Sequence, residues 1–369
     1  MKLVYTRRYN IGFLGFERLH PFDSRKYGRA WRAVGQEVRH LRNRAWVGVP
    51  RPASVADLAA VHDPAYLKRL YDPQELATAL ELPFVRRLPA WAAWRVIVRP
   101  MRWAVTGSLV AARAALASGL AVNLSGGYHH AKPDRGEGFC LFNDIAHLIH
   151  GLRAGGQLAP GDRVAYVDLD AHQGNGVSHH FRADSRVFMY DAFNPRIYPS
   201  YDRAARDRVD CPVPLPERCT GAQYLRLLEL SLPGFIDSIQ RAGRVGLAVY
   251  NAGTDVFAGD ALGGLDLSAA DVLTRDLYVI DLLRARGLPV VMLLSGGYSR
   301  ESYRLVANTL VALLRRYGGD SSSSAPDGNQ GRNGTSLGGS APRTSGHGRC
   351  VERRGAVETE GTFSSRTAA

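Results

Sequence analysis

Val164-Ala165-Tyr166-Val167-Asp168-Leu169-Asp170-Ala171-His172 passes from an apolar run into two acids and a histidine at alternate positions. Alternate side chains of an extended strand share a face, so Asp168, Asp170 and His172 are predicted to point the same way. Buried carboxylates at a strand end are costly unless something neutralises them, and a cation would do so. The glycines of Gln173-Gly174-Asn175-Gly176 then allow a tight turn. A helix-capping loop with a chance histidine is the alternative interpretation.

Other short apolar runs alternate with segments of helical apolar spacing on both sides of this stretch. Such runs, bounded by glycines, are typical of buried strands joined by crossover helices. The predicted fold class is α/β: a single domain of three layers, with a mostly parallel sheet and helices on both faces. The predicted strands are Lys2–Tyr5, Ala121–Leu124, Val164–Asp168, Arg186–Tyr190, Val245–Tyr250 and Pro289–Leu294, and the predicted helices are Met101–Ser118, Asn143–Ala154, Gly221–Arg241, Ser268–Arg286 and Glu301–Arg316.

The polar motifs follow these predicted strands, and ligands of parallel sheets bind at the carboxyl ends of the strands. Asp255 follows the run Val245–Tyr250 and is expected near the first loop if both strands are central. Asp170, His172 and Asp255 together would offer nitrogen and oxygen ligands that suit Zn²⁺ with open positions, and also Fe²⁺ or Mn²⁺. Taken alone, an aspartate after a strand is more often a helix cap.

Two more loops carry groups that could act on a metal-bound substrate. His129 and His130 lie just past the run Ala121–Leu124, where one of them could move a proton near neutral pH. Tyr298, after Ser295-Gly296-Gly297, could stabilise a developing oxyanion. A surface or structural histidine pair and an ordinary glycine turn are the alternatives.

Two further histidine pairs are predicted to be structural. His179 and His180 open the helix after the first loop, and His147 and His150 are three residues apart on a predicted helix without a nearby acid.

Composition excludes several classes of protein. The 369 residues are 45% hydrophobic and 22% charged, which is typical of a globular protein and not of a disordered or collagen-like chain. The net charge is +13, but the arginines are scattered, so the charge gives no strong indication of nucleic-acid binding. The chain shows no secretory signal, no membrane-spanning run and no CxxC pair among its four cysteines, and we predict a cytoplasmic location.

The composition changes after Tyr317. Residues 318–369 are rich in Gly, Ser and Arg and lack apolar periodicity, which predicts a disordered tail. Residues 1–317 are predicted to form the catalytic domain.

From Leu19-His20-Pro21-Phe22-Asp23 to Tyr303 the sequence resembles the histone deacetylases, within the arginase/deacetylase fold. The motifs Asp168–Gly176, Tyr250–Asp255 and Ser295–Tyr298 are most similar to the class IV branch and its bacterial relatives.

This resemblance implies that Asp170, His172 and Asp255 bind Zn²⁺. His129 and His130 match the tandem active-site histidines of the family, with His130 as the expected general base and acid.

Four further roles are implied by position. Asp168 matches the acid that orients His129 and often helps to hold a structural K⁺. Tyr298 matches the tyrosine that polarises the acyl carbonyl. Phe139 and Tyr198 match the aromatic walls of the acyl-lysine channel, and Gly138 matches a small lining residue.

Asn175 stands where class I enzymes carry an acid, as in the class II and IV branches. A neutral partner is expected to raise the basicity of His130 less than a carboxylate would.

The implied function is zinc-dependent removal of acetyl or longer fatty acyl groups from lysine in proteins. Hydrolysis of small acylated amines such as acetylpolyamines is the alternative, and a catalytically silent acyl-lysine binding scaffold is a third possibility. The sequence gives no oligomeric state.

Overall fold

The structure is a computed structural model that describes residues 1–11, 23 and 25–319. Most of the tail predicted at 318–369 lies outside the described residues, from position 320 on. So do residues 19–22 of the segment where the family resemblance begins.

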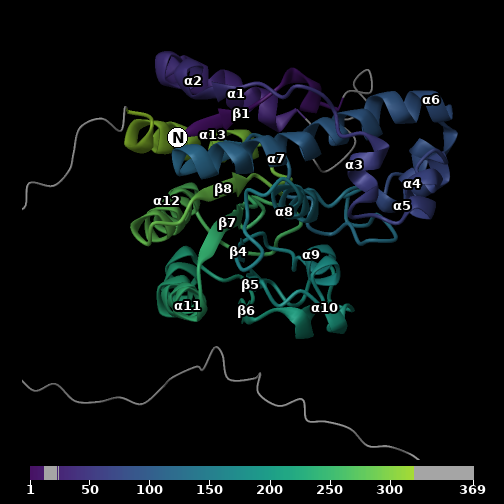
Figure 1. Cartoon of the computed structure of the whole chain (residues 1–369). Coiled ribbons are helices and arrows are strands. Elements are labelled where there is room, and N and C mark those ends of the chain that lie inside the picture. The colour runs from purple at the N-terminus through teal and green to yellow at the C-terminus, as the bar shows by residue number, and fades with distance from the viewer. Residues whose placement is uncertain (12–22, 24, 320–369) are drawn as a thin grey trace, which may run out of the picture.

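A single parallel sheet organises the described part of the chain (Figure 1). It has eight strands in the order β2-β1-β3-β8-β7-β4-β5-β6, and every neighbouring pair is parallel. The predicted α/β class is thus confirmed, and the sheet is wholly rather than mostly parallel. The strands are β1 (Lys2–Val4), β2 (Trp46–Val47), β3 (Leu120–Asn123), β4 (Arg163–Asp168), β5 (Val187–Phe193), β6 (Cys211–Pro214), β7 (Val245–Asn251) and β8 (Val290–Leu293).

All six predicted strands are present, but β2 and β6 were not predicted. The sheet has β6 at one edge, and Pro212 and Pro214 remove two of its backbone donors, which is tolerated only at an edge or a bulge. The strand β2 is two residues long at the other edge and leaves no periodicity to detect.

Helices cover both faces of the sheet, as the three-layer prediction requires. On one face α1, α11, α12 and α13 pack against alternate strand residues such as Leu3, Ala165 and Val167. On the other face α7 and α8 pack against the intervening residues, such as Val164 and Tyr166. These helices are α1 (Lys26–Glu37), α7 (Arg99–Ser118), α8 (Asp144–Ala154), α11 (Gly221–Ala242), α12 (Ala269–Ala285) and α13 (Ser302–Tyr317).

Local sequence explains where the predicted helices begin. Thr220 caps α11 and Ser268 caps α12, each in a capping box in which side chain and backbone bond reciprocally. Asn143 caps α8 by accepting a hydrogen bond from the Ala146 backbone.

A group of short helices beside the sheet forms a separate apolar cluster that the sequence did not predict. It occupies the right of Figure 1 and packs buried residues such as Tyr66, Leu76 and Phe142 together. Its elements are α3 (Val55–Ala59), α4 (Pro64–Arg69), α5 (Pro73–Ala79), the 3-10 helix Pro83–Arg87, α6 (Ala90–Ala93) and the π-helical turn Trp94–Val98. The remaining elements are α2 (Arg39–Ala45), α9 (Asn175–His180), α10 (Arg203–Arg208) and the 3-10 turn Arg7–Tyr9.

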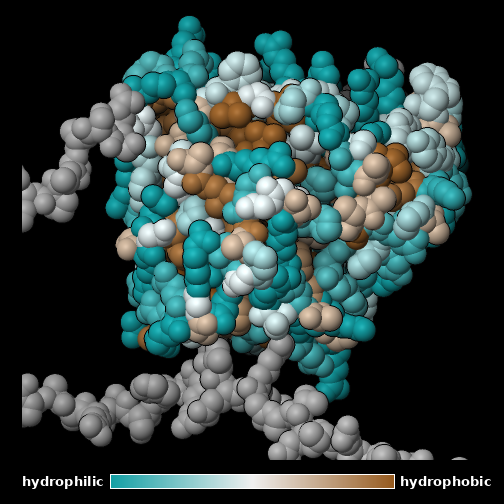
Figure 2. Space-filling model, in the orientation of Figure 1, coloured by the Kyte–Doolittle hydropathy of each residue, from teal (hydrophilic) through white to brown (hydrophobic). Residues whose placement is uncertain are grey.

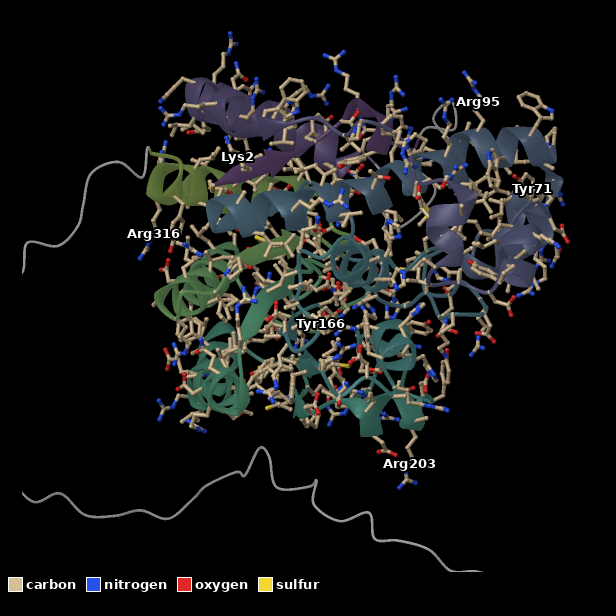
Figure 3. All side chains as sticks on the ribbon, viewed as in Figure 1. Lys2, Tyr71, Arg95, Tyr166, Arg203 and Arg316 are labelled. Atoms are coloured by element: carbon tan, nitrogen blue, oxygen red, sulfur yellow. The ribbon has the colours of Figure 1, made fainter. Side chains whose placement is uncertain are left out.

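The visible surface is mainly hydrophilic (Figure 2). Figure 3 shows Arg95, Arg203 and Arg316 projecting outward, whereas Tyr166 lies at the centre of the molecule. Among the described residues, no helix combines the length and the apolar character needed to cross a membrane.

Several histidines outside the motif loops lie in or beside the core: His62 and His147 are buried and His180 is partly buried. His62 hydrogen-bonds the Lys132 carbonyl through Nδ1 and packs its ring 5.2 Å from that of His180. Burial lowers the pKa of His62 and of His147 to about 4, and that of His180 to about 3. His179 contacts Asp202, with Nε2 and Oδ2 3.0 Å apart. The group of possible metal ligands found among the described residues does not include these histidines, and their structural role stays a prediction.

We predict that these histidines make the fold sensitive to mild acid. An unfolded histidine takes up a proton near pH 6.5, whereas the buried ones stay neutral until about pH 3–4, so stability falls as the pH drops below 6.5. Each contributes a loss of about 2 kcal/mol by pH 5. His180→Leu should therefore show a smaller drop in Tm between pH 7.5 and pH 5 than the parent chain. Exposed His40→Leu is the control, and an unchanged drop in His180→Leu would contradict the prediction.

Candidate active site

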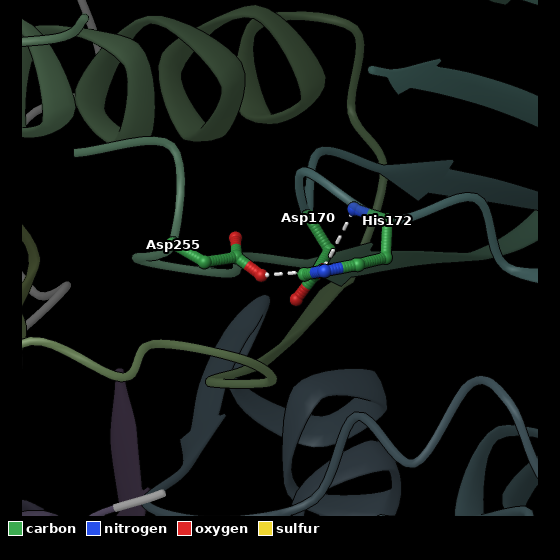
Figure 4. A group of neighbouring side chains, drawn as sticks. All are labelled: Asp170, His172 and Asp255. Carbon is green, nitrogen blue, oxygen red and sulfur yellow. Dashed lines mark hydrogen bonds and ion pairs between the residues drawn. The ribbon is translucent and has the colours of Figure 1, made fainter. Parts of the chain in front are cut away.

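The central group of the site is Asp170, His172 and Asp255, drawn in Figure 4. Asp170 and His172 follow β4, and Asp255 follows the neighbouring strand β7. His172 Nδ1 lies 3.1 Å from Asp170 Oδ1 and 3.0 Å from Asp255 Oδ2. All three side chains are buried, and one ligand atom from each lies within 4.8 Å of the other two. Adjacent parallel strands therefore bring these three predicted residues together.

Backbone contacts hold the two carboxylates in place. Gly296 donates its N–H to Asp170 Oδ2 at 2.8 Å, and Ala171 donates to Asp255 Oδ1 at 2.9 Å. A Cβ on Gly296 would lie 2.5 Å from Asp255 Oδ2 and 2.6 Å from Asp170 Oδ2. Only glycine at this position lets the loop approach both acids so closely.

The charges of this group call for a cation. Burial, and then the charge of Asp170, raise the pKa of Asp255 to about 7. Burial opposes protonation of His172, but its bonds to Asp170 and Asp255 outweigh burial and raise its pKa to about 10. Two acids therefore compete for one positive partner, His172. The set offers one nitrogen and two oxygen ligand atoms, which fits a catalytic Zn²⁺ site that keeps one position open.

The two predicted active-site histidines lie beside this group but in different environments. His129 Nδ1 is 2.8 Å from Asp168 Oδ2, and His130 Nδ1 is 2.8 Å from Asn175 Oδ1. Burial disfavours the charged form of both rings. For His129, Asp168 and Asp170 outweigh burial and raise the pKa to about 9. For His130, burial and the neighbouring histidines hold the pKa well below its usual value. The pair is split into a protonated and a neutral histidine, which suits acid–base work.

Asp191 was missed by the sequence analysis although it lies on β5, next to Asp168 in register. Its Oδ2 accepts the Gly174 N–H at 2.9 Å, whereas its Oδ1 has no hydrogen-bond partner within the described ranges. Burial, and then the charge of Asp168, hold the pKa of Asp191 well above its usual value. Asp191 could not be singled out from the sequence because it is a lone acid on a strand with no motif around it.

Aromatic rings surround the opening above the histidines. The ring of Tyr198 lies 4.8 Å from that of His130, and the ring of Tyr298 lies 5.8 Å from that of Phe139 and 6.0 Å from that of His172. Gly138 has a φ of 55°, and a Cβ there would lie 2.5 Å from the His130 ring. The residues predicted as channel walls thus lie around the same cavity.

Two adjoining cavities meet at this point. The outer one, of about 460 Å³, is lined by Tyr198, Phe139 and Tyr298 together with Leu82, Phe84 and Leu262, which the sequence analysis missed. The inner one, of about 80 Å³, is mainly apolar, and its walls include Tyr27, Leu80, Ile97, Met101 and Cys140. Several of these walls come from the unpredicted helical cluster, which carries no motif.

This fold and site are those of an amide hydrolase of the deacetylase kind. The family model for the histone deacetylase domain matches residues 20–314, and the chain belongs to the histone deacetylase family. It is 37% identical over 316 residues to "Histone deacetylase 2" of Arabidopsis thaliana, covering 86% of this chain and 79% of that protein. It is 29% identical over 300 residues to "Histone deacetylase 8" of Xenopus laevis, covering 75% and 85% of the two chains.

Solved structures show the same fold. The HD domain of HDA15 superposes with a TM-score of 0.65 at 18% identity, covering 87% of this chain and 92% of that domain. The resemblance seen in the sequence is therefore confirmed, both for the family and for the α/β arrangement with its parallel sheet.

We predict that removing bound metal destabilises the fold, because the buried carboxylates of Asp170 and Asp255 lose their counter-charge. Exhaustive chelation should lower Tm by about 5–10 °C, as expected for a ligand present far above its Kd. Metal content and Tm should be measured together, and stoichiometric Zn²⁺ should restore both. Asp255→Asn should bind little metal, with the surface variant Asp266→Asn as control. A chain with no metal before chelation and an unchanged Tm afterwards would contradict this prediction.

Proposed function

We propose that the protein hydrolyses the amide between an acyl group and the Nε of lysine, with Zn²⁺ held by Asp170, His172 and Asp255. The observation that carries this proposal is the convergence of that buried group with a neutral His130 and with Tyr298 on one cavity. Fe²⁺ or Mn²⁺ would suit the same ligands.

Zn²⁺ bound there would polarise the acyl carbonyl and lower the pKa of water. Nδ1 of His130 is engaged with Asn175, which leaves Nε2 to take a proton from the attacking water. As the C–N bond breaks, a protonated histidine of the pair returns a proton to the lysine amine, and the acyl group leaves as a carboxylate. His129, oriented by Asp168, supplies a fixed positive charge beside the reaction.

Tyr298 fits the role of oxyanion donor because it stays protonated. Burial, and then the charges of Asp170 and Asp255, hold its pKa well above the usual value, so the phenol keeps a proton to donate at any working pH.

A monovalent cation such as K⁺ beside Asp168 is part of the proposal. The unpartnered oxygen of Asp191, buried next to Asp168, supports it, since a buried carboxylate oxygen is rarely left without a partner.

The inner cavity is relevant to the length of the acyl group that the site accepts. Its apolar walls, which include Ile97 and Met101, offer burial to a chain longer than acetyl. Each buried methylene contributes about 0.8 kcal/mol. We therefore propose that short fatty acyl groups are accepted in addition to acetyl. Proteins with acyl-lysine are the proposed substrates, and small acylated amines are the second candidate.

Acyl preference can be measured with peptides that carry acetyl-, hexanoyl- or myristoyl-lysine and with enzyme of defined metal content. We expect hydroxamate-sensitive release from the acetyl and hexanoyl peptides, and a higher kcat/KM for hexanoyl because the inner cavity takes up methylenes. The myristoyl peptide measures whether the cavity limits chain length.

Acetyl strongly preferred over hexanoyl would show that the inner cavity does not receive the acyl chain. No release from any peptide by enzyme with one Zn²⁺ per chain would overturn lysine deacylation. Acetylated polyamines would then be tested, and inactivity there as well would favour a binding scaffold.

A second prediction separates the roles of His130 and Tyr298 from metal binding. His130→Ala should lower kcat by about 10²–10⁴-fold, as loss of a general base does. Tyr298→Phe should lower it by about 10²–10³-fold, as loss of one oxyanion donor does. Both should keep one Zn²⁺ per chain and the parent Tm, and Tyr317→Phe, far from the site, is the control. Near-parental turnover in either variant would refute its assigned role.

A further inference from the structure

Glu137 occupies a position that neither the sequence motifs nor the proposed reaction explains. It lies in the loop between His130 and Phe139, and 16% of its side chain is exposed. Four donors converge on its Oε1: Asn175 Nδ2 at 2.5 Å, the Tyr198 hydroxyl at 3.0 Å, Lys132 Nζ at 3.1 Å and the Tyr201 hydroxyl at 3.2 Å.

This carboxylate is held in its ionised form. Burial opposes ionisation, but Lys132 and the hydrogen bond from Asn175 outweigh it and lower the pKa of Glu137. Lys132 is itself buried and has a second carboxylate partner, with Nζ 2.7 Å from Asp202 Oδ2. Lys132 is therefore not dependent on Glu137 alone for a counter-charge.

The first consequence concerns the direction of the Asn175 amide. Its Nδ2 points to Glu137, and at 3.3 Å to Asp202, so its Oδ1 must face Nδ1 of His130. The reversed amide would press its oxygen against the Glu137 carboxylate and its NH₂ against the ring nitrogen. The carbonyl can only accept, so His130 must carry its proton on Nδ1, leaving the Nε2 lone pair for the site.

The second consequence concerns the channel wall. Tyr198 donates its hydroxyl to the same oxygen of Glu137 and sets its ring edge-on to His130. One carboxylate oxygen thus fixes both the partner of the general base and an aromatic wall of the cavity.

We infer that Glu137 is a positioning residue that fixes the tautomer of His130 through Asn175 and holds Tyr198 in the channel wall. This inference rests on the proposed function for its kinetic consequence, but the tautomer itself does not depend on the identity of the substrate.

The test compares three variants that separate hydrogen bonding from charge. Glu137→Met keeps the bulk of the side chain but offers no acceptor, and we expect kcat to fall about 10–100-fold, with a smaller rise in KM as Tyr198 loosens. Glu137→Gln keeps a carbonyl acceptor for Asn175 without the charge, and should stay within about 3-fold of the parent kcat. Asp202→Asn removes a charge from the same Lys132 and should also stay within about 3-fold.

Asp134→Asn, on the exposed neighbour in the same loop, is the control for the loop itself. If Glu137→Gln and Asp202→Asn fall as far as Glu137→Met, Glu137 only neutralises Lys132 and the inference is wrong. An unchanged kcat in Glu137→Met would overturn it as well.

A spectroscopic measurement tests the inference without relying on turnover. In the holoenzyme with ¹⁵N-labelled histidine, His130 should show the Nδ1–H tautomer, and Glu137→Met should show a mixture or the Nε2–H form. An Nε2–H tautomer in the parent chain would overturn the inference even if no variant folds. An inactive parent with the Nδ1–H tautomer would instead count against the proposed reaction alone.

Discussion

Two buried carboxylates that face each other across adjacent strands are the constraint on which the rest of the site depends. Asp170 and Asp255 are fully buried, and each would repel the other without compensation. The structure surrounds them with three positive or donor partners: His172 between them and the backbone N–H groups of Gly296 and Ala171. The glycine loop after β8 is therefore shaped by the acids, since a side chain at position 296 would collide with both.

The two adjacent histidines beside these buried acids have opposite pKa shifts. His129 and His130 are adjacent in sequence, and their ring centroids are 4.0 Å apart, yet one faces Asp168 and the other a neutral amide. A charged His129 makes a second charge on His130 unfavourable, which adds to the effect of burial. The neutral state of His130 is thus a consequence of burial, of a charged His129 held by Asp168, and of its neutral partner Asn175. It does not follow from the histidines alone.

Sequence reasoning succeeded where periodicity or a motif reported on local structure. The central strands and long helices were predicted because each is a continuous apolar pattern. The grouping of Asp170, His172 and Asp255 was predicted because parallel strands align their carboxyl ends. Sequence reasoning failed where the place of a residue in the site is set by tertiary contacts and not by a local pattern. Glu137 and Asp191 stand in no motif, and the cavity walls from Leu80 to Met101 come from short helices without strong periodicity. The edge strand β6 contains two prolines, and its sequence is therefore more typical of a loop.

Lys26 is an example of a tertiary contact of this kind, because it joins α1 to the loop that precedes Tyr298. It begins α1, is fully buried, and binds the carbonyl oxygens of Ser295 at 2.8 Å and Gly296 at 2.7 Å. Burial lowers its pKa to about 8, although the acids beneath the loop favour its charge. Ser295 has a φ of 40°, which is unfavourable for a residue with a Cβ, so the loop conformation depends on contacts such as those of Lys26. Since Tyr298 follows directly, its placement depends on a helix from the other end of the chain, which α13 packs in place.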